Sequence, residues 1–199
     1  MRTFITLLLV SICSIAYAQD TIGYRVGTTK NPYRPSQKPL PTIDVEIVTE
    51  KFKLENPILN PGNVLNTRFL HPIFSQEELN NKSLVLVFWN KECDNCLDKM
   101  SILNTHLKNL MKDNKSLLIS ITPEKKEDAL GILRDNPVSH TDLICNGKAI
   151  IEKLGITKFP TYVITDANHN IKLAVSGNDR ELYALIRHYL KPSVNGLTP

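Results

Sequence analysis

Two apolar runs dominate the pattern of hydrophobic and polar positions along the chain. Residues 84–89 form a continuous run rich in branched and aromatic side chains, and residues 117–121 form a second one. Short runs of this kind predict strands that are buried on both faces. Between them, apolar residues recur every three or four positions, as on one face of a helix: Leu97, Met100, Leu103, Leu107, Leu110 and Met111. This order predicts a right-handed βαβ unit with a parallel pair of strands.

Capping and turn residues predict the elements that surround this unit. A short helix is expected from a capping box at Ser75 and Glu78 to about Asn80, and a second helix from Thr122 and Pro123 to about residue 134. A short helix over residues 147–154, closed by Gly155, and a hairpin of residues 161–165 and 171–176 follow. The last helix begins at a capping box at residues 178–181 and ends at Pro192, and its expected inward residues are Leu182, Leu185, Ile186 and Tyr189.

The segment before the first apolar run has a different pattern. Residues 20–41 are polar and rich in proline, which predicts an extended linker. Apolar and acidic residues alternate over 43–47, which predicts an exposed strand, and Phe52 with Leu54 is its expected hairpin partner. Residues 60–63 read Asn-Pro-Gly-Asn, a turn signal.

The first 18 residues have the features of a secretory signal peptide. Arg2 supplies a positive charge, residues 4–12 are apolar, and residues 16–18 read Ala-Tyr-Ala, a small-x-small cleavage site. The apolar stretch is too short to span a membrane. Export is therefore expected, to the periplasm if the source is a Gram-negative bacterium. A lipoprotein anchored through Cys13 is the alternative, although Ile12 fits a lipobox poorly.

Composition and charge fit an ordinary globular protein. The chain is 42% hydrophobic and 22% charged. Its net charge is +4, from 24 Lys and Arg against 20 Asp and Glu, and loss of Arg2 with the signal leaves +3. The basic residues are scattered, which argues against nucleic acid as a partner. The expected organisation is a signal peptide (1–18), an extended segment with a possible β-hairpin (19–65), one α/β domain (66–191) and a tail (192–199).

Cys93 and Cys96 carry the candidate chemistry, because they lie where the first predicted strand turns into its helix. Cys93 is expected at the helix N-terminus, where unpaired N–H groups and the helix dipole favour an anion. The thiolate is the reactive form of cysteine. A C-x-x-C pair near a βαβ unit predicts a thioredoxin-like redox motif. Two readings stay open beside it. One is half of a zinc site, although the chain has no second C-x-x-C. The other is an inert structural disulfide.

Two motifs resemble one protein family. Residues 88–96 read F-W-N-K-E-C-D-N-C and residues 156–166 read I-T-K-F-P-T-Y-V-I-T-D. They resemble the TlpA/ResA-type branch of exported thioredoxin-like proteins, which typically read F-W-x-x-W-C-x-P-C and then V-x-x-x-P-T-x-x-x-I-D. The resemblance covers about residues 69–191. It implies an α/β thioredoxin-like fold, with a central mixed sheet, helices on both faces and an N-terminal extension.

The resemblance also implies roles for individual residues. Cys93 corresponds to the exposed nucleophile, and Cys96 to the residue that resolves the mixed disulfide. Pro160 corresponds to a cis-proline that faces the disulfide, and with Phe159 and Thr161 it is expected to bind the substrate. An ordinary trans-proline at the start of a strand is the alternative for Pro160.

Several positions near the cysteines depart from the family pattern or have two readings. Glu92 stands where tryptophan is usual, Asn95 where proline is usual, and Lys99 where many relatives have glutamate. The charges of Glu92 and Asp94 disfavour a nearby thiolate, and that of Lys99 favours it. The expected potential is that of a reductase or an isomerase, at about −200 mV or lower. Trp89 matches the aromatic residue beside the site, and a core tryptophan is an equally good reading.

Cys145 is the odd cysteine of the mature chain. Beside Leu143 and Ile144 it is expected to be a small buried hydrophobe. A third redox thiol and an intermolecular disulfide are the reactive alternatives. His140 with the three cysteines could form a metal set in principle, but no metal site is expected.

These observations predict an exported thiol–disulfide oxidoreductase that reduces protein disulfides through a Cys93–Cys96 couple. No cofactor is expected beyond this redox-active disulfide. The expected partners are protein thiols or disulfides and an upstream electron donor, itself membrane-bound. Two alternatives stay open: a copper carrier on the same fold, although carriers of the Sco type use C-x-x-x-C with a distant histidine, and a binding module with a structural disulfide.

Overall fold

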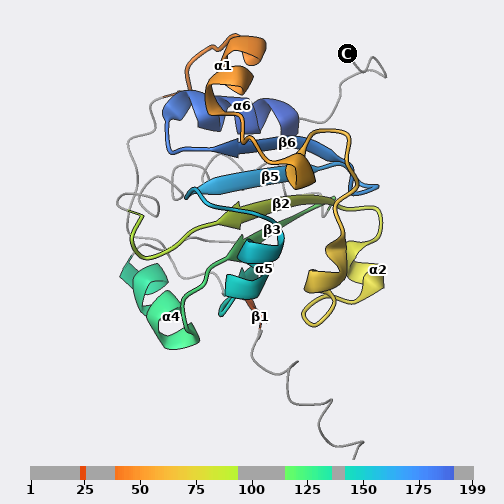
Figure 1. The fold of residues 1–199 in the computed structure, drawn as a ribbon, viewed down its shortest axis with the longest axis vertical. Helices are drawn as coiled ribbons and strands as arrows, with labels where there is room; N and C mark the ends of the chain where they lie inside the picture. Colours follow the sequence, from red (N-terminus) through yellow and green to blue (C-terminus); the bar gives the residue numbers. More distant parts are fainter. Residues whose placement is uncertain (1–22, 26–38, 94–114, 136–141, 191–199) are drawn as a thin grey trace, which may run out of the picture.

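The computed structural model describes residues 23–25, 39–93, 115–135 and 142–190, and within them six strands form one mixed sheet. The strand order is β1-β4-β3-β2-β5-β6 (Figure 1). β2 pairs in parallel with β3, and β3 with β4, whereas the other pairings are antiparallel. The strands are β1 (Gly23–Arg25), β2 (Ser83–Phe88), β3 (Ser116–Ile121), β4 (Asp142–Ile144), β5 (Thr161–Thr165) and β6 (Ile171–Ser176).

Helices cover both faces of this sheet. We call the face that carries Val85 and Tyr162 the first face and the face that carries Leu86 and Val163 the second face. The first face packs against α1 (Val45–Phe52), α4 (Lys126–Asp135) and α6 (Arg180–Leu190). Figure 1 shows α1 above α6, beside the β6 edge. No helix in the described part of the chain is long and apolar enough to cross a membrane.

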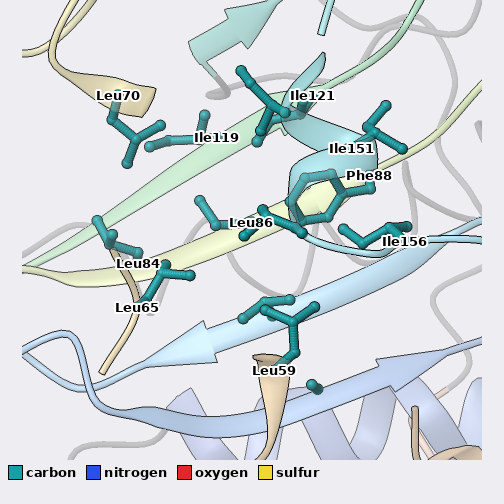
Figure 2. Close-up of a cluster of buried hydrophobic side chains, with 14 of the residues drawn as sticks. Leu59, Leu65, Leu70, Leu84, Leu86, Phe88, Ile119, Ile121, Ile151 and Ile156 are labelled. Atoms are coloured by element: carbon teal, nitrogen blue, oxygen red, sulfur yellow. The ribbon is translucent and has the colours of Figure 1, made fainter. Parts of the chain in front are cut away.

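The second face is filled by a cluster of aliphatic residues and phenylalanines. Leu84, Leu86 and Phe88 from β2 point into it because alternate residues of a strand face the same side. Figure 2 shows them with Ile119 and Ile121 of β3. The remaining cover comes from short elements that follow or precede the strands: η1 (Pro57–Leu59), η2 (Thr67–Leu70), α2 (Gln76–Leu79) and α5 (Lys148–Lys153).

Most of the elements expected from capping and turn residues are present. Ser75 and Glu78 form the capping box of α2. Gly155 follows α5 with φ of +64°, a conformation that favours glycine. β5 and β6 form the expected hairpin. In α6 the expected inward residues Leu182, Leu185 and Ile186 are buried, whereas the inward placement of Tyr189 was wrong, since it is exposed near the end of the helix. The helix expected between residues 97 and 111 lies outside the described residues.

The strand expected over residues 43–47 is a helix, so the hairpin prediction for this segment is wrong. Asp44 caps α1 by accepting hydrogen bonds from the N–H groups of Glu46 and Ile47, at 3.1 and 3.2 Å. Val45, Val48 and Phe52 have helical spacing and pack against the first face. Ile47, which the alternating pattern placed with the apolar residues, is 68% exposed.

The chain after α1 pairs with β6 instead. Lys53 forms an isolated antiparallel bridge with Val175. The N–H of Leu54 donates a hydrogen bond to the carbonyl of Ala174 at 3.1 Å. The residues expected to complete a local hairpin therefore extend the main sheet.

α4 begins at Lys126, later than the Thr122 and Pro123 signal predicted. The carbonyl of Thr122 accepts a hydrogen bond from the N–H of Gly147, and that of Glu124 accepts one from Asn146, both at 2.8 Å. A carbonyl used in this way is not available to the N–H four residues on, which a helix starting here would need. The contact with the loop after β4 thus delays the helix.

Candidate functional site

Cys93 lies at the end of the central strand. The N–H of Trp89 donates to the carbonyl of Ile121 at 3.1 Å, which continues the pairing of β2 with β3 by one residue. The N–H of Cys93 then donates to the carbonyl of Asn90 at 3.3 Å, closing a turn. Cys93 is disulfide-bonded and half-buried, and its partner lies outside the described residues. The expected catalytic residue Cys96 and the expected charged neighbours Asp94 and Lys99 also lie outside them.

The peptide bond between Phe159 and Pro160 is cis, which confirms the expectation for this proline. The carbonyl of Pro160 accepts hydrogen bonds from the Ser176 hydroxyl at 2.9 Å and from the Gly177 N–H at 3.0 Å. The hydroxyl of Thr161 donates to the carbonyl of Lys158 at 2.7 Å. Side chain and backbone bonds therefore hold this turn from both sides.

Strand register brings the cis-proline turn to the same end of the sheet as Cys93. Phe88, the last residue of β2, pairs with Thr161, the first residue of β5. Because this pair is antiparallel, the chain that leaves β2 lies next to the chain that enters β5. Residues 89–93 and 158–160 are thus neighbouring segments, as a site shared by Cys93 and Pro160 requires.

The expected substrate-binding residues differ in their burial. Phe159 is half-buried, whereas Pro160 and Thr161 are buried. Trp89 is 0% exposed and belongs to the core of the first face. The structure therefore places Trp89 as a core tryptophan, the second of its two readings, and a fully buried ring can affect a substrate only through other residues.

A carboxylate that sequence reasoning missed holds the loop before Cys93. Glu124 follows β3, and its Oε1 accepts a hydrogen bond from the N–H of Lys91 at 3.0 Å. Its side chain is 11% exposed, while Lys91 and Glu92 are exposed. An acid three residues after an apolar strand was the available signal, since the carboxyl ends of β2 and β3 meet at one end of the sheet.

The loop after β4 lies at the same end of the sheet as the loops after β2 and β3. The N–H of Thr122 donates to the carbonyl of Ile144 at 3.0 Å, and Gly147 donates back to Thr122. A Cβ on Gly147 would lie 2.8 Å from Cγ2 of Ile121 and 3.0 Å from the Thr122 carbonyl oxygen. Only glycine allows this approach, so the loops after β3 and β4 are packed backbone against backbone.

Cys145 is a free thiol buried in the first face, at 1% exposure. Burial raises the pKa of this thiol to about 11, because the thiolate is costly in an apolar environment. This agrees with the expected role as a small hydrophobe. His140 and Cys96, the other members of the metal set considered above, lie outside the described residues. Within the described ranges, no three His, Cys, Asp or Glu side chains gather as metal ligands.

Comparisons with known proteins establish the fold. Residues 80–171 match the family model described as thioredoxin-like. A provisionally assigned protein disulfide isomerase from Bacteroides thetaiotaomicron matches with a TM-score of 0.51 and 22% identity, over 57% of this chain and 74% of that one. A provisionally assigned thiol:disulfide interchange protein, DsbE, from Chlorobium tepidum matches with a TM-score of 0.50 and 19% identity, over 57% and 84%. No curated protein matches the chain. The expected thioredoxin-like α/β fold is thus confirmed.

Proposed function

We propose that the chain is an exported thiol–disulfide oxidoreductase that reduces protein disulfides through Cys93 and Cys96. One observation carries the proposal: a disulfide-bonded, half-buried cysteine at the end of the central strand, beside the cis Phe159–Pro160 bond. A purely structural disulfide has no need of a half-buried cysteine next to a cis-proline turn. The C-x-x-C spacing supplies Cys96 as the partner of Cys93.

The proposed reaction transfers two electrons to the substrate. The thiolate of Cys93 attacks one sulfur of a protein disulfide, and the other substrate sulfur leaves as a thiolate that takes up a proton. The product is a mixed disulfide. Cys96, as its thiolate, then attacks the sulfur of Cys93 and releases the second substrate sulfur, which also takes up a proton. The chain is left with the Cys93–Cys96 disulfide, which an upstream donor must reduce.

The turn at Pro160 is suited to hold an extended peptide during this exchange. The carbonyl of Pro160 is already used by Ser176 and Gly177. An incoming backbone is therefore expected to pair with Phe159, whose side chain is half-buried. Peptide binding through main-chain hydrogen bonds suits an enzyme that accepts many protein substrates.

The position of the two sulfurs predicts which one captures a substrate. Cys93 precedes the expected helix and is half-buried, while Cys96 is expected one turn further in. Without Cys96, release of the mixed disulfide must wait for an outside thiol. We expect Cys96→Ser, expressed with its signal peptide, to accumulate covalent complexes with other proteins that dithiothreitol dissolves, as seen on non-reducing gels.

Two variants serve as controls for this trap. Cys93→Ser should capture almost nothing, and Cys145→Ser should behave like the parent because Cys145 is buried. Equal trapping by Cys93→Ser and Cys96→Ser would mean that the roles are reversed. If neither variant traps a protein, and small thiols do not reduce the parent disulfide, the oxidoreductase proposal is wrong and a binding module is favoured.

A further inference from the structure

Glu124 connects three loops at the edge of the sheet where Cys93 lies. Its carboxylate accepts the hydrogen bond from the N–H of Lys91, in the loop after β2. Its backbone carbonyl accepts the one from the N–H of Asn146, in the loop after β4. Glu124 itself belongs to the loop after β3. One residue therefore fixes the loop that ends in Cys93 against both of its neighbours.

The carboxylate also places a negative charge beside this loop. Lys91 Nζ lies 3.9 Å from Oε2 of Glu124, but the Lys91 side chain is 58% exposed, so solvent screens the pair. Glu92, directly before Cys93, is exposed and also acidic. Lys91, Glu92 and Glu124 together sum to −1, from one positive and two negative charges.

We propose that Glu124 is a positioning residue of the Cys93 site, which holds residues 90–93 in place and limits the share of reduced Cys93 that is thiolate. This inference rests on the proposed function. A nearby negative charge disfavours a thiolate. A less stabilised thiolate makes the dithiol a better reductant, since a strong oxidant such as DsbA owes its potential to a stabilised reduced form. Glu124 would thus lower the reduction potential of the Cys93–Cys96 couple, which favours reduction of the substrate.

A charge-only substitution separates the two parts of this role. Glu124→Gln keeps the side-chain length and an oxygen that can accept from the Lys91 N–H, but it removes the charge. Loss of one negative charge beside the loop that ends in Cys93 is expected to raise the thiolate share of Cys93 by about tenfold. Because nucleophilicity falls as a thiol becomes more acidic, alkylation should quicken by only about threefold.

The measurement is the rate at which iodoacetamide alkylates Cys93 in the reduced protein at pH 7, with Cys93 identified by mass spectrometry. Glu124→Gln should be faster than the parent. Lys91→Gln should be slower, because it removes a positive charge while its backbone N–H still donates to Glu124. Glu152→Gln is the matched control: Glu152 is 66% exposed and pairs with Lys148 at 3.8 Å, on α5. It should equal the parent.

The glutathione equilibrium gives the second readout. In it the protein disulfide and two glutathione thiols exchange two electrons and two protons to give the dithiol and glutathione disulfide. Glu124→Gln should shift this equilibrium toward the dithiol. If Glu124→Gln matches the parent in both measurements while Glu124→Ala lowers the melting temperature, Glu124 is only structural and the inference is overturned. If the parent, reduced with dithiothreitol, does not reduce a protein disulfide, the proposed function fails instead, and the alkylation rates still test Glu124.

Discussion

The two faces of the sheet differ in whether their buried polar groups are hydrogen-bonded. On the second face, the buried side chains of Asn56, Thr161 and Thr165 are all hydrogen-bonded. Asn56 alone donates to the carbonyls of Leu154 at 2.7 Å and Gly155 at 3.0 Å and accepts from the N–H of Ile58 at 2.9 Å. The hydrogen bonds of Asn56 thus join the end of α5 to the segment before β2.

The first face carries buried polar atoms with no hydrogen-bond partner. Among the described residues these include Thr49 Oγ1, Trp89 Nε1 and Ser120 Oγ. Ser120 and Tyr162 both pair with Val87, one on each side of β2. The Tyr162 and Tyr183 rings meet edge to face, with centroids 6.3 Å apart.

This difference in hydrogen bonding indicates that the two faces have different roles. An unpaired buried polar group costs free energy, so native proteins keep few of them. Here Ser120 and Trp89 lie at the end of β2, the strand that leads to Cys93. Departures from complete hydrogen bonding are expected at functional sites rather than in purely structural layers. The hydrogen-bonded second face therefore stabilises the fold. On the first face, the unpaired polar groups beside the candidate site lower the free energy of unfolding.

The largest effect is expected when the hydrogen bonds of Asn56 on the second face are removed. Asn56→Ala should lower the free energy of unfolding by about 2–4 kcal/mol, because several buried backbone groups lose their partners together. Urea unfolding followed by circular dichroism measures this change. Asn63→Ala is the control, since Asn63 bonds the carbonyl of Pro57 at an exposed position. A loss at Asn56 no larger than at Asn63 would remove the distinction between the faces.

A smaller effect comes from the thiol of Cys145 on the first face. Folding raises the pKa of Cys145 from 9.0 to about 11, so the folded state keeps its proton where the unfolded state loses it. The stabilisation from the neutral thiol is thus complete below pH 9 and is lost between pH 9 and 11. The loss should reach about 2 kcal/mol at most.

Comparison with Cys145→Val isolates this contribution from the lysines and tyrosines that titrate in the same range. The difference in unfolding free energy between parent and variant should shrink or reverse as the pH rises from 9 to 11. A difference that stays constant over this range would show that Cys145 does not ionise on unfolding as described.

The smallest effect is expected on the first face, where a buried hydroxyl has no hydrogen-bond partner. Ser120→Ala removes a buried hydroxyl that makes no hydrogen bond. The free energy of unfolding should therefore change by less than about 0.5 kcal/mol, or rise slightly. Thr165→Val on the second face is the counterpart, since its hydroxyl accepts from the N–H of Leu84 at 3.0 Å. Thermal unfolding of both variants should show a clear loss only for Thr165→Val.

Local patterns predicted the parts of the fold whose signals lie close together in the sequence. The apolar run of β2, the capping box of α2 and the hairpin of β5 and β6 each depend on neighbouring residues. The cis bond before Pro160 followed from a family resemblance. α1 was misread because an alternating stretch of five residues fits a strand and a helix equally well, until Asp44 and α6 decide between them.

Long-range contacts were not predictable in this way. The partner of Glu124 is the N–H of Lys91, more than thirty residues earlier in the chain, and an acid placed after an apolar strand does not identify that partner. The same holds for β4, whose three residues are too few to show a period. Both belong to the edge of the sheet that carries Cys93, so tertiary contacts rather than propensity built that part of the site.

The pairing of β1 with β4 has a consequence for self-association. β1 is a three-residue strand from the segment expected to be a linker, and it runs antiparallel to β4 at the margin of the sheet. A margin strand without a neighbour presents a row of free N–H and C=O groups, which can recruit a strand from another molecule. A chain shortened to start after Arg25 would leave β4 open in this way. With β1 in place the margin strand is β1 itself, and because β1 and β4 are each only three residues long, either margin offers an incoming strand few free groups.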